Sequence, residues 1–170
     1  MSASGDSLVL HLQDAAATER VGAALAACLS GGMYIALGGD LGTGKTTLAR
    51  GLLHAAGVPG SVKSPTYTLV ESYNASSLDL YHFDFYRFDD PDEWESTGFS
   101  DCFNADSVCL VEWPERAAGF LPTPDLALAL SHPTGSQAGR TLRVTAHSPA
   151  GRRCVDALRR RFRSSLVAER

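Results

Sequence analysis

The chain has 170 residues, of which 44% are hydrophobic and 20% charged, and its formal net charge is −4. This composition is typical of one globular domain and excludes a disordered chain, and the lack of any run of about 18 apolar residues excludes a membrane-spanning helix. Residues 151–170 carry a charge of +5 and the first 150 residues a charge of −9, which excludes a general nucleic-acid-binding surface on the acidic body.

The first third of the chain predicts two strands, each followed by a helix. Alternating leucines at residues 8–12 predict a strand, and Asp14 is placed to cap an alanine-rich helix that runs to about Leu29. The apolar run at residues 34–37 predicts a buried strand, and a helix is expected over about 46–56. A glycine-rich turn joins this second pair.

The middle of the chain predicts a hairpin and a further buried strand. Residues 66–73 and 78–87 have the composition of its two strands. The two-residue period of the second strand places His82 and Asp84 on one face. The unbroken apolar run at residues 108–111 predicts a strand that is covered on both faces.

The last part of the chain predicts short elements and a basic helix. Asp90-Pro91 starts a helix, and residues 126–146 predict a late hairpin. We expect the basic C-terminal helix to occupy residues 149–170, with Leu166 on its apolar side. Residues 1–170 are therefore interpreted as a single domain of the α/β class.

Residues 39–46, with the sequence GDLGTGKT, match the phosphate-binding motif G-x-x-x-x-G-K-[ST]. Glycines let backbone N–H groups surround phosphate oxygens, and the helix that follows points its positive end at the anion. The Lys45 ammonium can reach the β- and γ-phosphates, and the Thr46 hydroxyl can bind Mg²⁺. The expected phosphate-binding residues are Gly39, Asp40, Leu41, Gly42, Thr43, Gly44, Lys45 and Thr46.

Two acidic residues are candidates to complete a nucleotide site. Glu112 directly follows the apolar run at 108–111, and ligands gather at the carboxyl ends of parallel strands, so Glu112 is the best candidate to serve the metal ion. Asp84 lies between two phenylalanines, where an unpaired carboxylate is costly to bury. The alternatives are a surface carboxylate for Glu112 and an ion pair with an arginine for Asp84.

Three further segments, taken with the phosphate loop, resemble the TsaE (YjeE) family. They are VKSPTYTLVE at residues 62–71, HFDFYR at 82–87 and LVEWP at 110–114, and the resemblance covers roughly residues 8–147. It implies a P-loop NTPase fold, in which a parallel core sheet is flanked by antiparallel strands and helices.

The family is the bacterial ATPase component of the machinery that makes threonylcarbamoyladenosine on tRNA. The resemblance implies ATP and Mg²⁺ as cofactors and slow hydrolysis by the isolated subunit. This ATPase is needed to form the threonylcarbamoyl group on an adenosine of tRNAs that read codons beginning with adenine. TsaD and TsaB are the implied partners, tRNA is reached through their complex, and TsaD performs the transfer itself.

The resemblance also implies roles for individual residues. Lys45, Asp84 and Glu112 are carried over as catalytic residues, Thr46 and Glu112 as residues that serve the metal ion, and Thr47 as a phosphate contact. Trp113 is either an aromatic lever beside Glu112 or a packing residue. The implied switch and partner residues are Ser64, Pro65, Thr66 and Trp113.

The expected compartment is the cytoplasm. The chain begins without the basic segment and apolar run of a signal peptide. Its four cysteines have no CxxC spacing, which favours free thiols in a reducing environment over a zinc site.

Two other functions stay open from the sequence. A small P-loop kinase is disfavoured because residues 63–73 lack the arginines of a lid, and a nucleotide-controlled interaction module would make turnover incidental. No arginine is evident near the expected γ-phosphate, since Arg87 is predicted on the strand face opposite Asp84. A partner would then complete the site, and the C-terminal arginines are either a solvated helix face or a contact to tRNA or an acidic partner.

Overall fold

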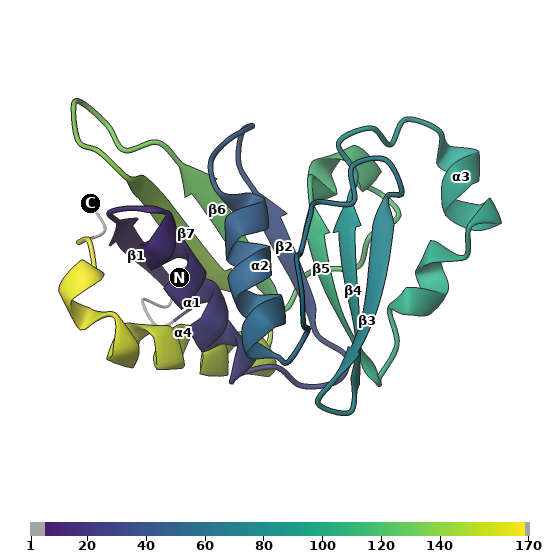
Figure 1. Ribbon diagram of the computed structural model, residues 1–170, viewed down its shortest axis with the longest axis horizontal. Helices are drawn as coiled ribbons and strands as arrows, with labels where there is room; N and C mark the ends of the chain where they lie inside the picture. Colours follow the sequence, from purple (N-terminus) through teal and green to yellow (C-terminus); the bar gives the residue numbers. More distant parts are fainter. Residues whose placement is uncertain (1–5, 169–170) are drawn as a thin grey trace.

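One seven-stranded sheet organises residues 6–168, which are the residues that this computed structural model describes. The strands are β1 (Ser7–Leu12), β2 (Tyr34–Gly38), β3 (Val70–Ala75), β4 (Leu78–Asp84), β5 (Ser107–Glu112), β6 (Leu126–Ser131) and β7 (Arg140–Ala146). Their order in the sheet is β1-β7-β6-β2-β5-β4-β3 (Figure 1). Strands β6, β2, β5 and β4 run parallel, whereas β1, β7 and β3 pair antiparallel. The expected α/β fold with a parallel core and antiparallel flanks is confirmed.

Four helices complete the fold. They are α1 (Ala15–Ala26), α2 (Lys45–Ala55), α3 (Pro91–Ser96) and α4 (Pro149–Arg161), with short 3₁₀ turns at Phe99–Cys102, Pro114–Ala117 and Arg163–Ser165. Asp14 caps α1 as predicted, because its carboxylate accepts the N–H of Ala17 at 2.8 Å. No helix within residues 6–168 is long and apolar enough to cross a membrane.

Helices α1 and α2 lie against one face of the sheet and touch each other through their backbones (Figure 1). A Cβ atom on Gly22 would lie 2.2 Å from the Leu48 carbonyl oxygen, and one on Gly51 would lie 2.3 Å from the Glu19 carbonyl oxygen. Only glycine permits this approach. The contact fixes α2, and therefore the phosphate loop at its start.

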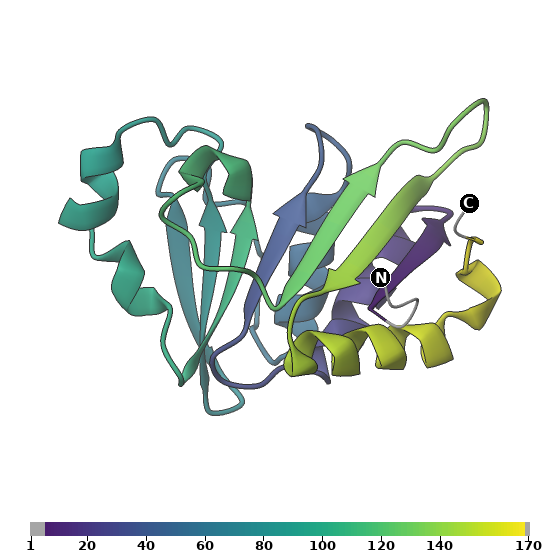
Figure 2. The same ribbon diagram turned by 180° about the vertical axis from the view of Figure 1, so that it is seen from behind.

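The two faces of the sheet have cores of different composition. Below α1, α2 and α4 the core is mainly aliphatic, with leucines such as Leu10, Leu25 and Leu52 fully buried. The opposite face of β4 and β5 carries an aromatic cluster. Its rings belong to Tyr34, Phe83, Phe85, Phe88, Trp94, Phe99 and Phe103. Figure 2 views the molecule from the side opposite to Figure 1. The predicted alternation of β4 is confirmed, since Leu80 packs in the aliphatic core and Phe83 in the aromatic cluster.

Strand β4 is shorter than predicted and ends at Asp84 instead of residue 87. The Asp84 carboxylate accepts the backbone N–H of Tyr86 at 2.9 Å, which turns the chain away from the sheet. The strand period therefore does not apply to Arg87, whose guanidinium lies 4.6 Å from the ring centroid of Tyr67. The prediction that Arg87 lies on a face of this strand was wrong, because the strand ends three residues before it.

Strand β3 begins at Val70 instead of residue 66. The preceding residues form a turn in which the Leu69 N–H donates to the Pro65 carbonyl at 2.8 Å. Leu69 has a φ of 65°, in the left-handed region that a strand excludes. The predicted strand start is thus part of the loop that carries the expected switch residues.

The C-terminal helix ends at Arg161, so the prediction of one helix over 149–170 was wrong. A short turn follows, and Leu166 then pairs with Leu10 of β1, while the Val167 N–H donates to Val9 at 2.9 Å. Pairing with the edge strand satisfies backbone groups of β1 that a longer helix would leave open. The expected helical residues 169–170, like residues 1–5, lie outside the described residues.

Candidate functional site

The phosphate loop joins the end of β2 to the start of α2 at the carboxyl edge of the parallel strands (Figure 1). Gly39 adopts a φ of 135°, and a Cβ there would lie 2.4 Å from the Leu130 carbonyl oxygen, so this position requires glycine. Gly44 precedes α2 and offers no side-chain cap. The first N–H groups of α2 therefore have no side-chain cap and are available to an anion that binds in the loop.

Lys45 is buried, with only 5% of its surface exposed. Its ammonium donates to the carbonyls of Gly39 at 2.5 Å and Asp40 at 2.8 Å, and it lies 4.2 Å from the ring centroid of Trp113. Burial lowers the pKa of Lys45, and the charge of Glu112 opposes that shift. The cation–π contact offsets part of the cost of burying the charge.

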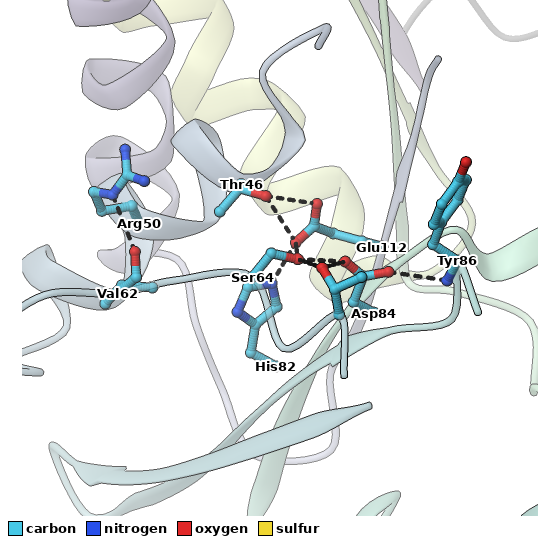
Figure 3. A network of polar contacts seen from close by, with 9 residues as sticks. Thr46, Arg50, Val62, Ser64, His82, Asp84, Tyr86 and Glu112 are labelled. Carbon is cyan, nitrogen blue, oxygen red and sulfur yellow. Dashed lines mark hydrogen bonds and ion pairs between the residues drawn. The ribbon is translucent and has the colours of Figure 1, made fainter. Parts of the chain in front are cut away.

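The two candidate acids face each other across neighbouring parallel strands. Asp84 of β4 is in register with Glu112 of β5, and both side chains are buried. The Thr46 hydroxyl lies 2.9 and 3.2 Å from the two carboxylate oxygens of Glu112 (Figure 3). Glu112 is therefore not a surface carboxylate, and it meets the first turn of α2.

The expected switch segment is attached directly to these acids. The Ser64 hydroxyl donates to Asp84 and lies 3.4 Å from Glu112 (Figure 3). The Thr66 hydroxyl lies 3.2 Å from Asp84. Hydroxyls and the Tyr86 N–H, rather than a guanidinium, thus hold Asp84 among the described residues. Pro65, which stands between Ser64 and Thr66 in the sequence, is buried.

Trp113 is held in an unusual backbone conformation. Its φ of 56° lies in the left-handed region, which costs a residue of this kind roughly 1–3 kcal/mol. The ring covers the ammonium of Lys45 and lies 5.0 Å from the ring centroid of Tyr86. The structure therefore places Trp113 in contact with Lys45 of the phosphate loop.

The family model described as "Threonylcarbamoyl adenosine biosynthesis protein TsaE" matches residues 12–142. The chain belongs to the TsaE family. A relative from Haemophilus influenzae, named as the tRNA threonylcarbamoyladenosine biosynthesis protein TsaE, is 45% identical over 125 residues, which are 74% of this chain and 77% of the relative. A Bacillus subtilis protein of the same name is 38% identical over 113 residues, covering 66% and 70%.

The fold of this TsaE-family chain is also that of a solved relative. The crystal structure of YdiB from Bacillus subtilis superposes with a TM-score of 0.73 and 28% identity, covering 91% of this chain and 95% of that one. The likeness extends over nearly all of the sheet and helices described above.

Two polar side chains of the site were given no role from the sequence. The Nε2 atom of His82 lies 2.7 Å from a carboxylate oxygen of Glu112. Arg140 donates to the carbonyl of Gly42 at 3.1 Å and lines, with Thr47, a cavity of about 230 Å³ beside the loop. The strand period had already placed His82 beside Asp84, whereas Arg140 is 98 residues from Gly42 and gave no local signal.

The chemistry of the oxygen atoms at this site fits Mg²⁺. The Thr46 hydroxyl and the buried carboxylates of Glu112 and Asp84 are hard donors, and a divalent cation would reduce the repulsion between the two carboxylates. Within residues 6–168 no three His, Cys, Asp or Glu side chains form a metal cage. This is expected, since Mg²⁺ takes few protein ligands and keeps waters and phosphate oxygens.

Proposed function

We propose that this chain binds ATP with Mg²⁺, hydrolyses it slowly, and serves the formation of threonylcarbamoyladenosine on tRNA. The observation that carries the proposal is the hydrogen bond between Glu112 and Thr46, the residue that follows Lys45 of the phosphate loop. Family membership supports the pathway, because the relatives named above carry that biosynthetic name.

Each side chain of the site has a distinct task in this proposal. Lys45 neutralises the β- and γ-phosphates, while Thr46 and Glu112 would hold Mg²⁺, which supplies further positive charge at the phosphate oxygens. Thr47 would contact phosphate, and the cavity that it lines with Arg140 would offer space for another part of the nucleotide. Asp84 would support turnover by holding the switch segment through the hydroxyls of Ser64 and Thr66.

TsaD and TsaB subunits are the proposed partners, with tRNA reached through them. Two arginines of the described residues are engaged in other contacts: Arg140 donates to the Gly42 carbonyl of the phosphate loop, and Arg87 lies on the ring of Tyr67 in the switch segment. An arginine that neutralises the γ-phosphate contributes roughly 10³–10⁵ in rate, so the proposal expects slow turnover by the chain alone as long as these two side chains keep their contacts. A partner group, or a rearrangement that the partner causes, would supply the missing charge.

A nucleotide-controlled interaction module is the second candidate function. The switch segment joins the acids on its inner side, through Ser64 and Thr66, and exposes 83% of Tyr67 on its outer side. A segment with these two sides can report the nucleotide state to a partner even when turnover is incidental.

The substitution Asp84→Asn distinguishes the two candidates. We expect it to retain ATP binding, measured by calorimetry, and to lose both hydrolysis and threonylcarbamoyladenosine formation in a reconstituted mixture with TsaD, TsaB and tRNA. A pure binding switch would keep modification activity despite the lost hydrolysis. Lys45→Ala should lose binding and activity together, and the exposed Asp89→Asn is the matched control. Absence of ATP binding by the unaltered chain would contradict the proposal.

A further inference from the structure

His82 is a fully buried, polar side chain in the middle of the site. It lies on β4 two residues before Asp84, and its ring has no exposed surface. Its Nε2 atom lies 2.7 Å from Oε2 of Glu112, whose side chain is 3% exposed. A carboxylate accepts hydrogen bonds, so the proton is assigned to Nε2, which then donates a hydrogen bond to Glu112.

The other ring nitrogen of His82, Nδ1, does not extend a chain of hydrogen bonds along which a proton could move. Among the described residues, Nδ1 has no hydrogen-bond partner, and in Figure 3 it points away from Glu112. A buried polar atom without a partner costs about 1–3 kcal/mol, which an apolar residue of similar size would avoid. A general-base role for His82 is disfavoured, because its ring has no access to solvent. Within residues 6–168, Glu112 is also its only hydrogen-bond partner.

The hydrogen bond acts on the carboxylate that meets the phosphate loop. Glu112 is the last residue of β5, lies beside the buried Asp84, and has both carboxylate oxygens close to the Thr46 hydroxyl. Repulsion between the two carboxylates would drive Glu112 out of this position unless donors held it. Thr46 would also bind the metal ion, and the Ser64 hydroxyl lies farther away, at 3.4 Å, on the switch segment. His82, at 2.7 Å, is therefore the close donor that is fixed in a strand.

We propose that His82 is a positioning residue, which holds the Glu112 carboxylate toward Thr46 so that the pair is arranged for the Mg²⁺ of bound ATP. The inference rests on the proposed function for the metal ion, but its structural part concerns the His82–Glu112 contact alone. Residues that orient metal-binding side chains typically change metal affinity by 10–100-fold when they are replaced.

Two replacements of His82 test the donor while keeping the volume similar. We expect His82→Met to raise the Mg²⁺ concentration for half-maximal hydrolysis at least about tenfold and to lower kcat, with ATP affinity in EDTA unchanged within about twofold. His82→Gln, whose amide can donate from the same place, should recover most of the loss. Leu80→Met, on the same strand face, controls for altered packing, and melting curves check folding.

A Met variant with the Mg²⁺ requirement of the unaltered chain would overturn the proposal, as would a Gln variant that is equally impaired. Should the Met variant fail to fold, the Gln variant and the following measurement decide.

Nuclear magnetic resonance of the ligand-free chain with ¹⁵N-labelled histidine tests the contact without nucleotide or metal. We expect one slowly exchanging Nε2–H signal that is missing in His82→Gln and displaced in Glu112→Ala. A proton on Nδ1, or a signal indifferent to Glu112→Ala, would overturn the inference. If the unaltered chain bound no ATP, the proposed function would fail, and this spectrum would still decide whether His82 holds Glu112.

Discussion

The aliphatic and aromatic faces of the sheet position different halves of the same site. On the aliphatic face, α1 and α2 meet through glycine backbones, and this contact sets the phosphate loop. On the aromatic face, stacked rings pack behind the ends of β4 and β5, which carry Asp84 and Glu112. The position of the phosphate loop therefore depends on a close backbone contact between two helices, which leaves no space for a Cβ atom. The positions of the two acids depend instead on the volume of the aromatic side chains packed behind them.

The largest expected change in the free energy of unfolding comes from removing one buried ring of the aromatic face. Phe83 is fully buried, and its ring centroid lies 5.3 Å from Phe85 and 5.5 Å from Phe99. Phe83→Ala should lower the free energy of unfolding by about 4 kcal/mol, measured by urea denaturation. Phe120→Ala, at the exposed rim of the same cluster, should cost much less. Equal losses would mean that ring packing does not support β4.

The aliphatic face should respond to an added atom rather than a removed one. Gly51→Ala places a Cβ against the Glu19 carbonyl and should destabilise the chain by about 2 kcal/mol, despite the higher helix propensity of alanine. The exposed Ala55→Ser on the same helix should change stability by less than about 0.5 kcal/mol. Denaturation of both variants checks the difference, and a stabilised alanine variant would show that the helices can separate without loss.

Trp113 lies where the two halves meet, so its replacement tests their coupling. Trp113→Leu removes the cation–π contact with Lys45 and should weaken ATP binding by about 1 kcal/mol, roughly fivefold, in calorimetry. Unfolding free energy should change less than for Phe83→Ala, because the ring is only partly buried. Unchanged affinity would show that the ring does not support the ammonium.

The last prediction compares the thiol reactivity of two cysteines and needs no change in the fold. Cys28 lies on the aliphatic face and Cys109 on the aromatic face. A hydrogen bond from Cys154, with help from nearby arginines, lowers the pKa of Cys28 to about 7, although burial opposes the shift. Burial raises the pKa of Cys109 to about 12. Because the thiolate is the nucleophile, iodoacetamide labelling of Cys28 should rise with pH and reach half its maximum near pH 7, while Cys109 stays unlabelled.

Mass spectrometry of the labelled peptides checks this prediction, with Cys28→Ser as the control. Faster labelling of Cys109 than of Cys28 would contradict the assigned environments.

Much of the fold and the loop could be predicted because the signals are local. The apolar run before GDLGTGKT and the helix after it are continuous in sequence, and the structure has β2 and α2 there. The shortened β4 could not be predicted, since Asp84 ends it by binding the backbone of Tyr86 while the composition continues to favour a strand. The early end of α4 likewise depends on the distant edge of β1.

The sequence by itself determined the phosphate loop, the order of strands and helices, and the identity of the two acids, because periodicity and motif spacing are properties of neighbouring residues. Only the tertiary structure decided that Asp84 and Glu112 lie in register, that Ser64 and Thr66 bind Asp84, and that His82 binds Glu112. The physical reason is that these contacts follow from the parallel pairing of β4 with β5, which no local pattern encodes.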